Sequence, residues 1–271
     1  MILLPADWSQ DYSYESYSAM ESRITSFDNV TSLGKEASGV YDIYQIEMGN
    51  PDGAVIYVQS SLHGAEWEGT IFAMRFMEQL RDDTFTDTEF RNHLLANYRL
   101  IFVPFANPWG YANQIRENSN SVDLNRDFYD LTQVESQTIA NDLDILKPFA
   151  FLDIHLMQIL YNSHELIWGA GQYEHMLIQD HMADSWSAYM DSEPVRRWTP
   201  SSDSTSGLAR TYAAGITSPY LGDNTMSFIS EITRETENGV YFTRPQIMKA
   251  GMGHLYIFLH YVMEYFENRS V

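Results

Sequence analysis

The chain has 271 residues, of which 44% are hydrophobic, so it can bury the sizeable core of a folded domain. It carries 37 acidic and 16 basic side chains, and a surface with a formal net charge of −21 should repel nucleic acid and anionic membranes. It has no cysteine, which excludes disulfides and thiolate ligands and leaves His, Asp and Glu to hold any metal.

No apolar run approaches the roughly 20 residues needed to span a bilayer. The apolar start Met1–Pro5 is too short for the core of a signal peptide, and no Lys or Arg precedes it. We therefore expect a soluble, cytoplasmic protein that binds neither nucleic acid nor membranes. The sequence leaves its oligomeric state open.

Helix and strand patterns alternate from the beginning of the chain. The spacing of apolar residues predicts a helix within Asp11–Asn29, and alternation predicts a strand at Val40–Met48. Ala54–Ser60, rich in Val, Ile and Tyr, is predicted to be a second strand. The turn sequence Asn50–Gly53 lies between the two strands and predicts that they form a β-hairpin.

The middle of the chain contains a long irregular segment between regular elements. A helix is predicted over Glu66–Asp82, and a buried strand at Tyr98–Phe105. The following segment, Asn107–Tyr129, is polar and contains turn signals. A loop of that length in a compact domain is usually functional or disordered.

The next helix and strand are predicted from their end signals. Thr132–Lys147 has helical spacing, and Thr132 with Glu135 fits a capping box at its beginning. The apolar run Phe149–Leu156 is predicted to be a strand.

The last third of the chain again alternates helix and strand. Helices are predicted at Gln172–Asp191 and Pro245–Phe266, on either side of a strand at Met226–Ile232. Ser192–Thr225 is rich in Ser, Thr, Gly and Pro and is predicted to be mostly loop, with a short helix at Gly207–Ala214.

This alternation predicts the fold class. Strands that alternate with helices favour an α/β protein with a central mixed, mostly parallel β-sheet and helices on both faces. The sequence shows no internal repeat, low-complexity tract or linker, so we expect residues 1–271 to form a single domain.

His63 and Glu66 follow the strand Ala54–Ser60 and are separated only by Gly64 and Ala65. An imidazole and a carboxylate at this spacing can converge on one cation, because the small residues between them allow a tight turn. Zinc accepts both ligand types, and a catalytic zinc keeps one position open for water. A lone His-x-x-Glu also occurs by chance, so a metal site needs further ligands.

Asp153 and His155 lie inside an apolar strand, where polar side chains are costly unless they are paired or bound. They are two residues apart and therefore point to the same face. His155, near the carboxyl end of the strand, is a candidate third metal ligand, and Asp153 is suited to orient a ligand histidine. A hydrogen-bonded structural histidine is the alternative.

Two arginines, Arg116 and Arg126, lie in the long polar loop, the second directly after Asn125. An arginine beside an asparagine offers planar, charge-assisted donors suited to a carboxylate. Salt bridges to the many surrounding acidic residues are the alternative.

Glu231 stands near the end of the strand Met226–Ile232. A carboxylate at a strand end beside a metal can serve as general base toward water. The alternative is an ordinary surface carboxylate.

Five motifs occur in a fixed order along the chain. They are His63-x-x-Glu66, Asn107-Pro108-x-Gly110-Tyr111, Val122-Asp123-Leu124-Asn125-Arg126-x-Phe128, Asp153-Ile154-His155 and Phe228-x-x-Glu231. In this order the chain resembles the zinc metallocarboxypeptidases, the M14 or carboxypeptidase A-like family, over roughly residues 14 to 260. The Gly64-Ala65 pair, where the family commonly has Ala-Arg, is typical of divergent bacterial members.

The resemblance implies a role for each matching residue. His63, Glu66 and His155 would bind one zinc ion, the His, His, Glu set of carboxypeptidase A. Glu231 would be the general base and acid. Arg116 would polarise the scissile carbonyl and stabilise the oxyanion, and Asn125 with Arg126 would grip the terminal carboxylate of the substrate.

Two family positions are not matched clearly. The mobile tyrosine that closes over the substrate aligns near Ser202–Ser204, and Tyr212 and Tyr220 lie nearby without an assignment. The side-chain specificity position falls near Leu208–Arg210, where an arginine would favour acidic substrates and a leucine apolar ones.

Three functions remain open on the sequence. The first is a carboxypeptidase that hydrolyses the C-terminal amide bond of a peptide. The second is a zinc deacylase of N-acyl amino acids, of the aspartoacylase or succinylglutamate desuccinylase type, whose substrate also has a free carboxylate. The third is a binding module without catalysis, which the presence of Glu231 and all three candidate ligands disfavours.

Overall fold

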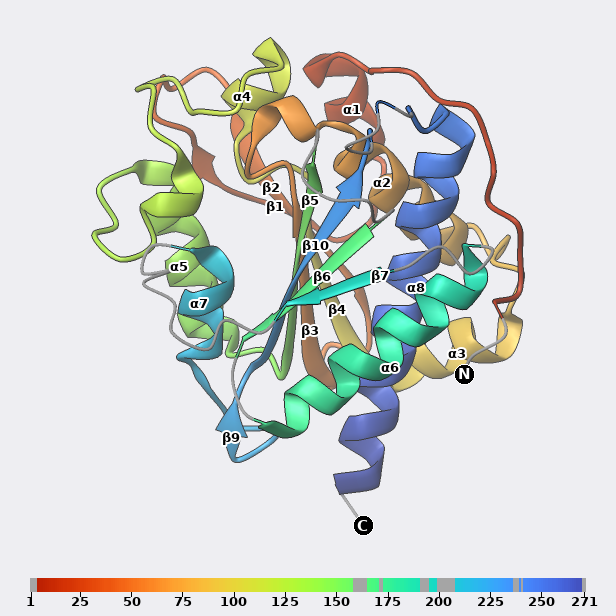
Figure 1. Ribbon diagram of the computed structural model, residues 1–271. Coiled ribbons are helices and arrows are strands. Elements are labelled where there is room, and N and C mark those ends of the chain that lie inside the picture. Colours follow the sequence, from red (N-terminus) through yellow and green to blue (C-terminus); the bar gives the residue numbers. More distant parts are fainter. Residues whose placement is uncertain are drawn as a thin grey trace.

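The computed structural model describes residues 4–157, 165–170, 173–190, 195–198, 208–235, 239 and 241–269. Their centre is an eight-stranded sheet in the order β1-β2-β4-β3-β5-β10-β6-β7, with helices on both faces (Figure 1). The prediction of an α/β fold with a mixed sheet between helices is therefore confirmed.

The elements have the following bounds. The strands of the large sheet are β1 (Val30–Lys35), β2 (Asp42–Gly49), β3 (Ala54–Ser60), β4 (Tyr98–Val103), β5 (Ala150–Met157), β6 (Glu165–Ala170), β7 (Val195–Trp198) and β10 (Met226–Thr233). A small two-stranded sheet joins β8 (Thr217–Ser218) and β9 (Asp223–Asn224). The helices are α1 (Tyr17–Ile24), α2 (Glu68–Arg81), α3 (Thr88–Asn97), α4 (Pro108–Asn113), α5 (Val134–Leu146), α6 (Tyr173–Tyr189), α7 (Ala209–Ala214) and α8 (Arg244–Arg269), with 3₁₀ helices η1 (Gly64–Glu66) and η2 (Leu124–Arg126).

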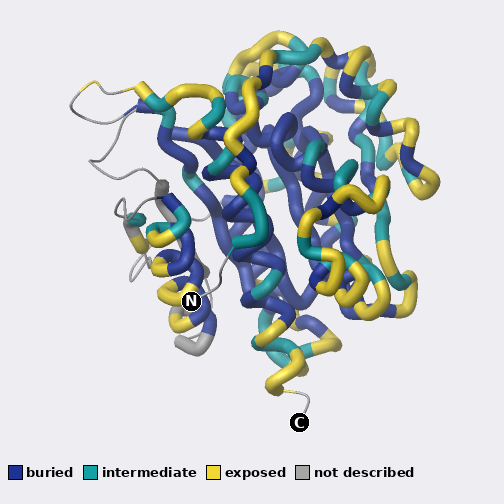
Figure 2. Tube along the Cα trace, turned by 90° about the vertical axis from the view of Figure 1, so that its right-hand side faces the viewer, coloured by how far each residue is buried: buried dark blue, intermediate teal, exposed yellow. Residues whose placement is uncertain are grey.

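The four central strands β4, β3, β5 and β10 run parallel to one another, and β3 and β5 are buried along their whole length. Ile56 and Val58 of β3 join the core that contains α2 and α8, whereas Val55 and Tyr57 join the core that contains α5 and α7. The sheet is the buried centre of the molecule in Figure 2. Coverage of both faces explains the nearly continuous apolar runs in these strands.

The predicted hairpin between β2 and β3 is wrong. β4 lies between them, antiparallel to β2 and parallel to β3. The turn after β2 is closed as expected, because Gly53 N donates to Asn50 O at 2.9 Å, but Asn50 N donates to Tyr98 O at the start of β4. The turn therefore lies over the start of β4. β3 pairs in parallel with β4 and does not form a hairpin with β2.

The predicted capping box at α5 is also wrong. The helix begins at Val134, and the buried carboxylate of Asp127 accepts hydrogen bonds from the backbone of Thr132 and Gln133 and from Ser136 Oγ. The carboxylate of Glu135 is buried elsewhere, accepting from Ala37 N and Asn118 Nδ2. Asp127 therefore fixes the two residues that precede the helix, and the N-cap Gln133 makes no side-chain capping bond.

The long polar segment is more ordered than the sequence predicts. It contains α4, whose N-cap Asn107 accepts a hydrogen bond from Gly110 N at 2.9 Å, and the 3₁₀ helix η2. The Asn-Pro pair at the start of α4 is the usual N-terminal signal of a helix. Strands β1, β6 and β7 and helix α3 are further elements that the sequence analysis did not assign.

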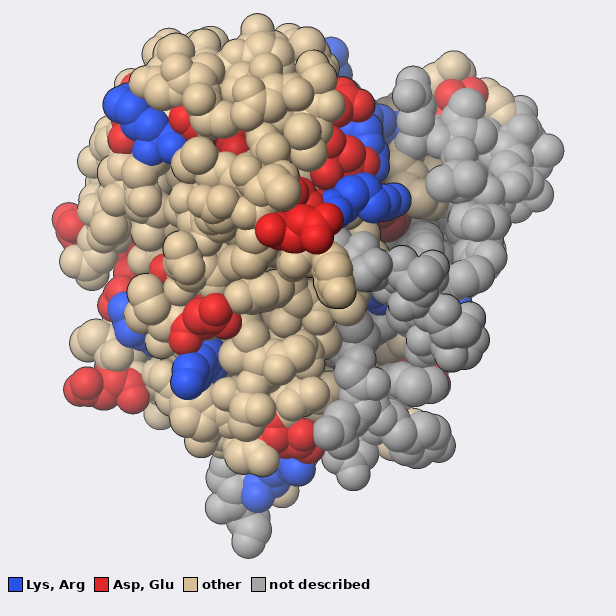
Figure 3. Space-filling model, turned by 90° about the vertical axis from the view of Figure 1, so that its left-hand side faces the viewer, with Lys and Arg blue, Asp and Glu red and all other residues tan. Residues whose placement is uncertain are grey.

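None of the described helices combines the length and apolarity needed to cross a membrane. The negative charge is dispersed on the face seen in Figure 3. There, acidic and basic groups are scattered over a mostly uncharged surface. The acidic groups on this face therefore do not form one continuous negative patch.

One glycine contact fixes the turn that carries the His63 and Glu66 motif. Gly64, in η1, packs directly on α4, and a Cβ at Gly64 would lie 1.8 Å from the backbone carbon of Gly110. A side chain at Gly64 would push the two backbones apart, because the atoms that it would meet are backbone atoms. Gly64 therefore allows η1 to lie directly against α4.

We expect Gly64→Ala to destabilise the protein by about 3 kcal/mol, because the methyl group overpacks a backbone contact. Gly69→Ala, in α2, is the matched control, since its Cβ would meet only side chains, at 3.1 Å or more. Its effect should stay within about 1 kcal/mol. Urea unfolding of both variants measures the difference, and equal stability of the two would contradict the role of the contact.

Burial raises the pKa of Asp127, but hydrogen bonds from Ser136, Thr132 and Gln133 outweigh it and leave the pKa below its ordinary value. A carboxyl with a lowered folded-state pKa stabilises the fold above its ordinary pKa of about 4 and loses that effect as the pH falls. We expect Asp127→Asn to cost about 1–3 kcal/mol at pH 7 and clearly less at pH 3. Asp130→Asn, exposed on the same loop, should change little at either pH, and a pH-independent loss at Asp127 would contradict the assignment.

Candidate functional site

The side chains of His63, Glu66 and His155 form one buried cluster at the carboxyl ends of β3 and β5. His63 Nδ1 lies 2.8 Å from Glu66 Oε1, and His155 Nδ1 lies 3.0 Å from Glu66 Oε2. The two Nδ1 atoms are 3.0 Å apart. The structure thus brings together the three residues that the sequence predicts to be metal ligands.

The cluster fits a zinc ion. Ligand atoms of a tetrahedral zinc, with bonds near 2.0–2.1 Å, lie about 3.4 Å apart, close to the separations seen among the three side chains. The two imidazole nitrogens face each other beside a carboxylate, and all three groups need a positive partner. Only a shared cation or proton supplies it. Three protein ligands leave one position open, as in catalytic zinc sites.

Each histidine is held from behind by an aspartate. His63 Nε2 lies 3.0 Å from Asp123 Oδ1, and His155 Nε2 lies 2.9 Å from the buried Asp153 Oδ2. These contacts turn both Nδ1 atoms toward the cluster, the usual arrangement of carboxylate–histidine pairs behind a metal. Asp153 therefore lies on the far side of the His155 ring, where it can orient the ligand.

Glu66 is held in its charged form. Burial raises the pKa of its carboxyl, but the two histidines outweigh this effect and hold it well below the ordinary value. Leu156 N also donates to Glu66 Oε2 at 2.9 Å. The backbone of β5 thus fixes the carboxylate that η1 supplies.

Asp123 connects the histidine cluster to Arg116. Its Oδ2 accepts from Arg116 Nη2 at 2.9 Å and from Nε at 3.1 Å, while its Oδ1 faces His63. Arg116 Nη1 lies 3.7 Å from Glu66 Oε1. The guanidinium is therefore fixed beside the candidate metal position. The sequence analysis gave Asp123 no role, although it lies in the same motif as Asn125.

The pair Asn125 and Arg126 divides between the interior and the surface. Asn125 is buried in η2, with Nδ2 3.5 Å from His155 Nε2. Its Oδ1 accepts from Ala209 N, the first residue of α7, at 3.1 Å. Arg126 is exposed, and its Nη1 donates to Asn125 O at 2.6 Å.

Glu231 lies next to the cluster through strand register. β10 and β5 are parallel neighbours, and Glu231 is the direct partner of His155. Burial raises the pKa of Glu231 to about 7. The two histidines lower the pKa and only partly offset burial, while the nearby Glu66 carboxylate raises it further. The group can therefore gain or lose a proton near neutral pH.

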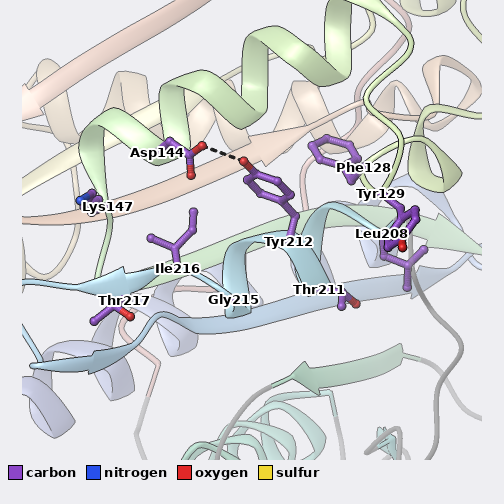
Figure 4. Close-up of a pocket in the computed structure, with 10 residues that line it drawn as sticks. All are labelled: Phe128, Tyr129, Asp144, Lys147, Leu208, Thr211, Tyr212, Gly215, Ile216 and Thr217. Atoms are coloured by element: carbon purple, nitrogen blue, oxygen red, sulfur yellow. Dashed lines mark hydrogen bonds between the residues drawn. The ribbon is translucent and has the colours of Figure 1, made fainter.

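The two unmatched family positions fall near α7. Residues 202–204 lie outside the described residues. The hydroxyl of Tyr212 donates to Asp144 Oδ2 of α5 at 2.8 Å, so its ring points into the pocket between α5 and α7 (Figure 4). Tyr220 is 38% exposed beside β9. Leu208 precedes α7, and Arg210 within it is fully buried.

Comparisons with known proteins find similarities to zinc carboxypeptidases. A model of the zinc carboxypeptidase family, peptidase M14, matches residues 14–258. Carboxypeptidase SOL1 of Arabidopsis thaliana is 30% identical over 132 residues, which cover 46% of this chain and 26% of that protein. The chain thus matches only about a quarter of the length of this curated relative.

Solved structures share the fold. A metallo-carboxypeptidase from Burkholderia cenocepacia superposes with a TM-score of 0.74 at 17% identity, covering 94% of this chain and 70% of that one. Carboxypeptidase A from Helicoverpa armigera gives a TM-score of 0.68 at 19% identity, covering 94% and 71%.

We expect the protein to bind one zinc ion per chain through His63, Glu66 and His155. Replacing any of the three by Ala should lower zinc affinity by about 100-fold or more, and Asp153→Asn by about 10-fold or more. Metal analysis with chelator competition measures this. His93→Ala, at the surface, is the control, and full zinc affinity in His155→Ala would exclude the site.

Proposed function

Since the chain belongs to the zinc carboxypeptidase family, we propose that it is a zinc-dependent carboxypeptidase that hydrolyses the C-terminal amide bond of a peptide. The observation that carries the proposal is the convergence of His63, Glu66 and His155, with Glu231 in register beside His155. A metal held by three ligands and faced by a carboxylate of raised pKa is suited to hydrolysis.

His63, Glu66 and His155 would hold the zinc ion, which when bound supplies a Lewis acid and lowers the pKa of water. Glu231 would take the proton from the attacking water and later deliver it to the leaving amine. Burial raises the pKa of the Glu231 carboxyl above its ordinary value, which favours a group that holds the proton between the two transfers.

Arg116 would stabilise the negative charge that develops on the scissile carbonyl oxygen. Asp123 holds its guanidinium with two hydrogen bonds, so the donors are in place before substrate binds. Donors fixed in advance stabilise a developing charge without reorganisation.

Asn125 and Arg126 would bind the free carboxylate of the substrate. The buried Asn125 amide next to His155 would provide a directional donor, and the exposed Arg126 a charge that attracts the carboxylate from solvent. Recognition of a terminal carboxylate here would place the last amide bond beside the metal, which makes the enzyme an exopeptidase.

A deacylase of N-acyl amino acids would bind the free carboxylate of its substrate through the same residues, Asn125 and Arg126. It would also use the same three zinc ligands. The family match supports the peptidase. An assay panel separates the two: N-acetyl dipeptides with acidic, basic and apolar C-terminal residues on one side, and N-acetyl, N-succinyl and N-formyl amino acids on the other. Turnover confined to the second set would replace the carboxypeptidase by the deacylase.

On the best substrate of that panel, we expect Glu231→Gln to lower kcat by about 10³-fold, because the amide cannot accept the proton from water. Zinc content should not change, since Glu231 is not a proposed ligand. Glu89→Gln, exposed on α3, is the matched control and should retain full activity. Wild-type turnover in Glu231→Gln would leave the proposed mechanism without its base.

A further inference from the structure

The side-chain amide of Asn125 has two ends, and the structure assigns each a different neighbour. Its oxygen accepts the backbone N–H of Ala209 at 3.1 Å. Its nitrogen therefore points the other way, to 3.5 Å from His155 Nε2. A rotation of the amide by half a turn would set the Ala209 N–H against an NH₂ group, leaving a buried donor without an acceptor, so the contact selects one orientation.

This orientation keeps the hydrogens of Asn125 Nδ2 available. His155 Nε2 lies 2.9 Å from Asp153 Oδ2, and with Nδ1 turned to the metal position the proton of the ring is on Nε2. A protonated Nε2 cannot accept from Asn125. The amide nitrogen is thus held as a donor, which is the polarity that a substrate carboxylate needs.

The peptide N–H that sets this orientation belongs to the six-residue helix α7, which packs against α5 and β10. Between α7 and α5 lies a pocket of about 630 Å³ (Figure 4), and the bond from Tyr212 to Asp144 crosses it at 2.8 Å. Burial and the Asp144 carboxylate raise the pKa of Tyr212 to about 12, so the phenol keeps the proton that it donates. On the other side, Ser227 Oγ of β10 donates to Arg210 O at 2.8 Å.

We propose that α7 is a positioning element for the carboxylate subsite: the N–H of Ala209 fixes the Asn125 amide with its donor toward the substrate, and the Tyr212–Asp144 bond holds α7 in place. The inference rests on the proposed function, because it assigns Asn125 to the carboxylate. It adds that the backbone of α7 controls how tightly the substrate carboxylate is bound.

Ala209→Pro removes the N–H. Ala209 is the first residue of α7, a position at which proline is favoured, and Leu208 before it has φ −84° and ψ 138°, which proline permits. Ala209 is fully buried, so the amide peptide and the double variant described below separate loss of the N–H from the packing of the added ring. Val134→Pro controls only for proline at the start of a helix, since Val134 is the exposed first residue of α5 and follows a residue with φ −100° and ψ 146°.

Binding is measured in the zinc-loaded Glu231→Gln protein, so that turnover does not interfere. The probes are an N-acetyl dipeptide chosen from the activity panel and the same dipeptide with a C-terminal amide. Ala209→Pro should raise the Kd of the free-carboxylate peptide about tenfold and leave the Kd of the amide within about twofold. Val134→Pro should change neither.

A double variant separates positioning from general damage. In an Asn125→Ala background, Ala209→Pro should have no further effect on Kd, because the amide that it positions is absent. Equal losses for both peptides, or the same loss in the Asn125→Ala background, would overturn the proposal. An unchanged Kd in Ala209→Pro would overturn it as well.

Tyr212→Phe is the second variant, and it decides the matter if Ala209→Pro does not fold. It removes only the hydrogen bond to Asp144. It should raise the Kd of the free-carboxylate peptide about threefold and leave the Kd of the C-terminal amide peptide unchanged. No change for either peptide would overturn the proposal. If the Glu231→Gln parent binds both peptides with the same Kd, the proposed binding of the substrate carboxylate by Asn125 and Arg126 is wrong. This inference is then wrong as well.

Discussion

The candidate site depends on a cluster of ionisable side chains that are buried together. Two imidazole nitrogens and the Glu66 carboxylate meet within about 3 Å, and Asp123 and Asp153 stand behind the histidines. Buried groups of this kind are costly unless a counter-ion joins them, and a divalent cation satisfies all three inward-facing atoms at once. The sheet makes the cluster possible, because parallel strands β3 and β5 end at the same edge.

The parts of the site differ in how they are fixed. His155 and Glu231 are placed by the register of two adjacent parallel strands, and a slip of one residue would turn either side chain to the other face. Arg116 and Asn125 come from the irregular segment, where Asp123 holds the Arg116 guanidinium and the Asn125 side-chain oxygen accepts from the backbone of Ala209. The proposed base Glu231 and the ligand His155 therefore rest on the rigid sheet, whereas Arg116 and Asn125 rest on loops, where change is tolerated better.

The sequence predicted the parts of the fold that depend on local patterns. β3 and β5 are buried on both faces, so their apolar runs stand out, and polar residues within β5 signalled the site. The hairpin prediction failed because a local turn signal says nothing about a third strand, β4, that inserts between β2 and β3. The capping prediction at α5 failed because the helix begins at Val134 and a more distant carboxylate, Asp127, takes the backbone N–H of Thr132.

The contact between Asn125 and Ala209 shows where such prediction stops. The two residues are 84 positions apart, and one of them contributes only its backbone N–H, a group that every residue except proline possesses. No residue type or spacing can mark such a contact in a sequence. Yet the N–H decides whether the buried Asn125 amide presents a donor or an acceptor, and hence which charge the proposed subsite would attract. The polarity of the proposed carboxylate subsite would therefore be a property of the folded chain, set by the backbone of α7.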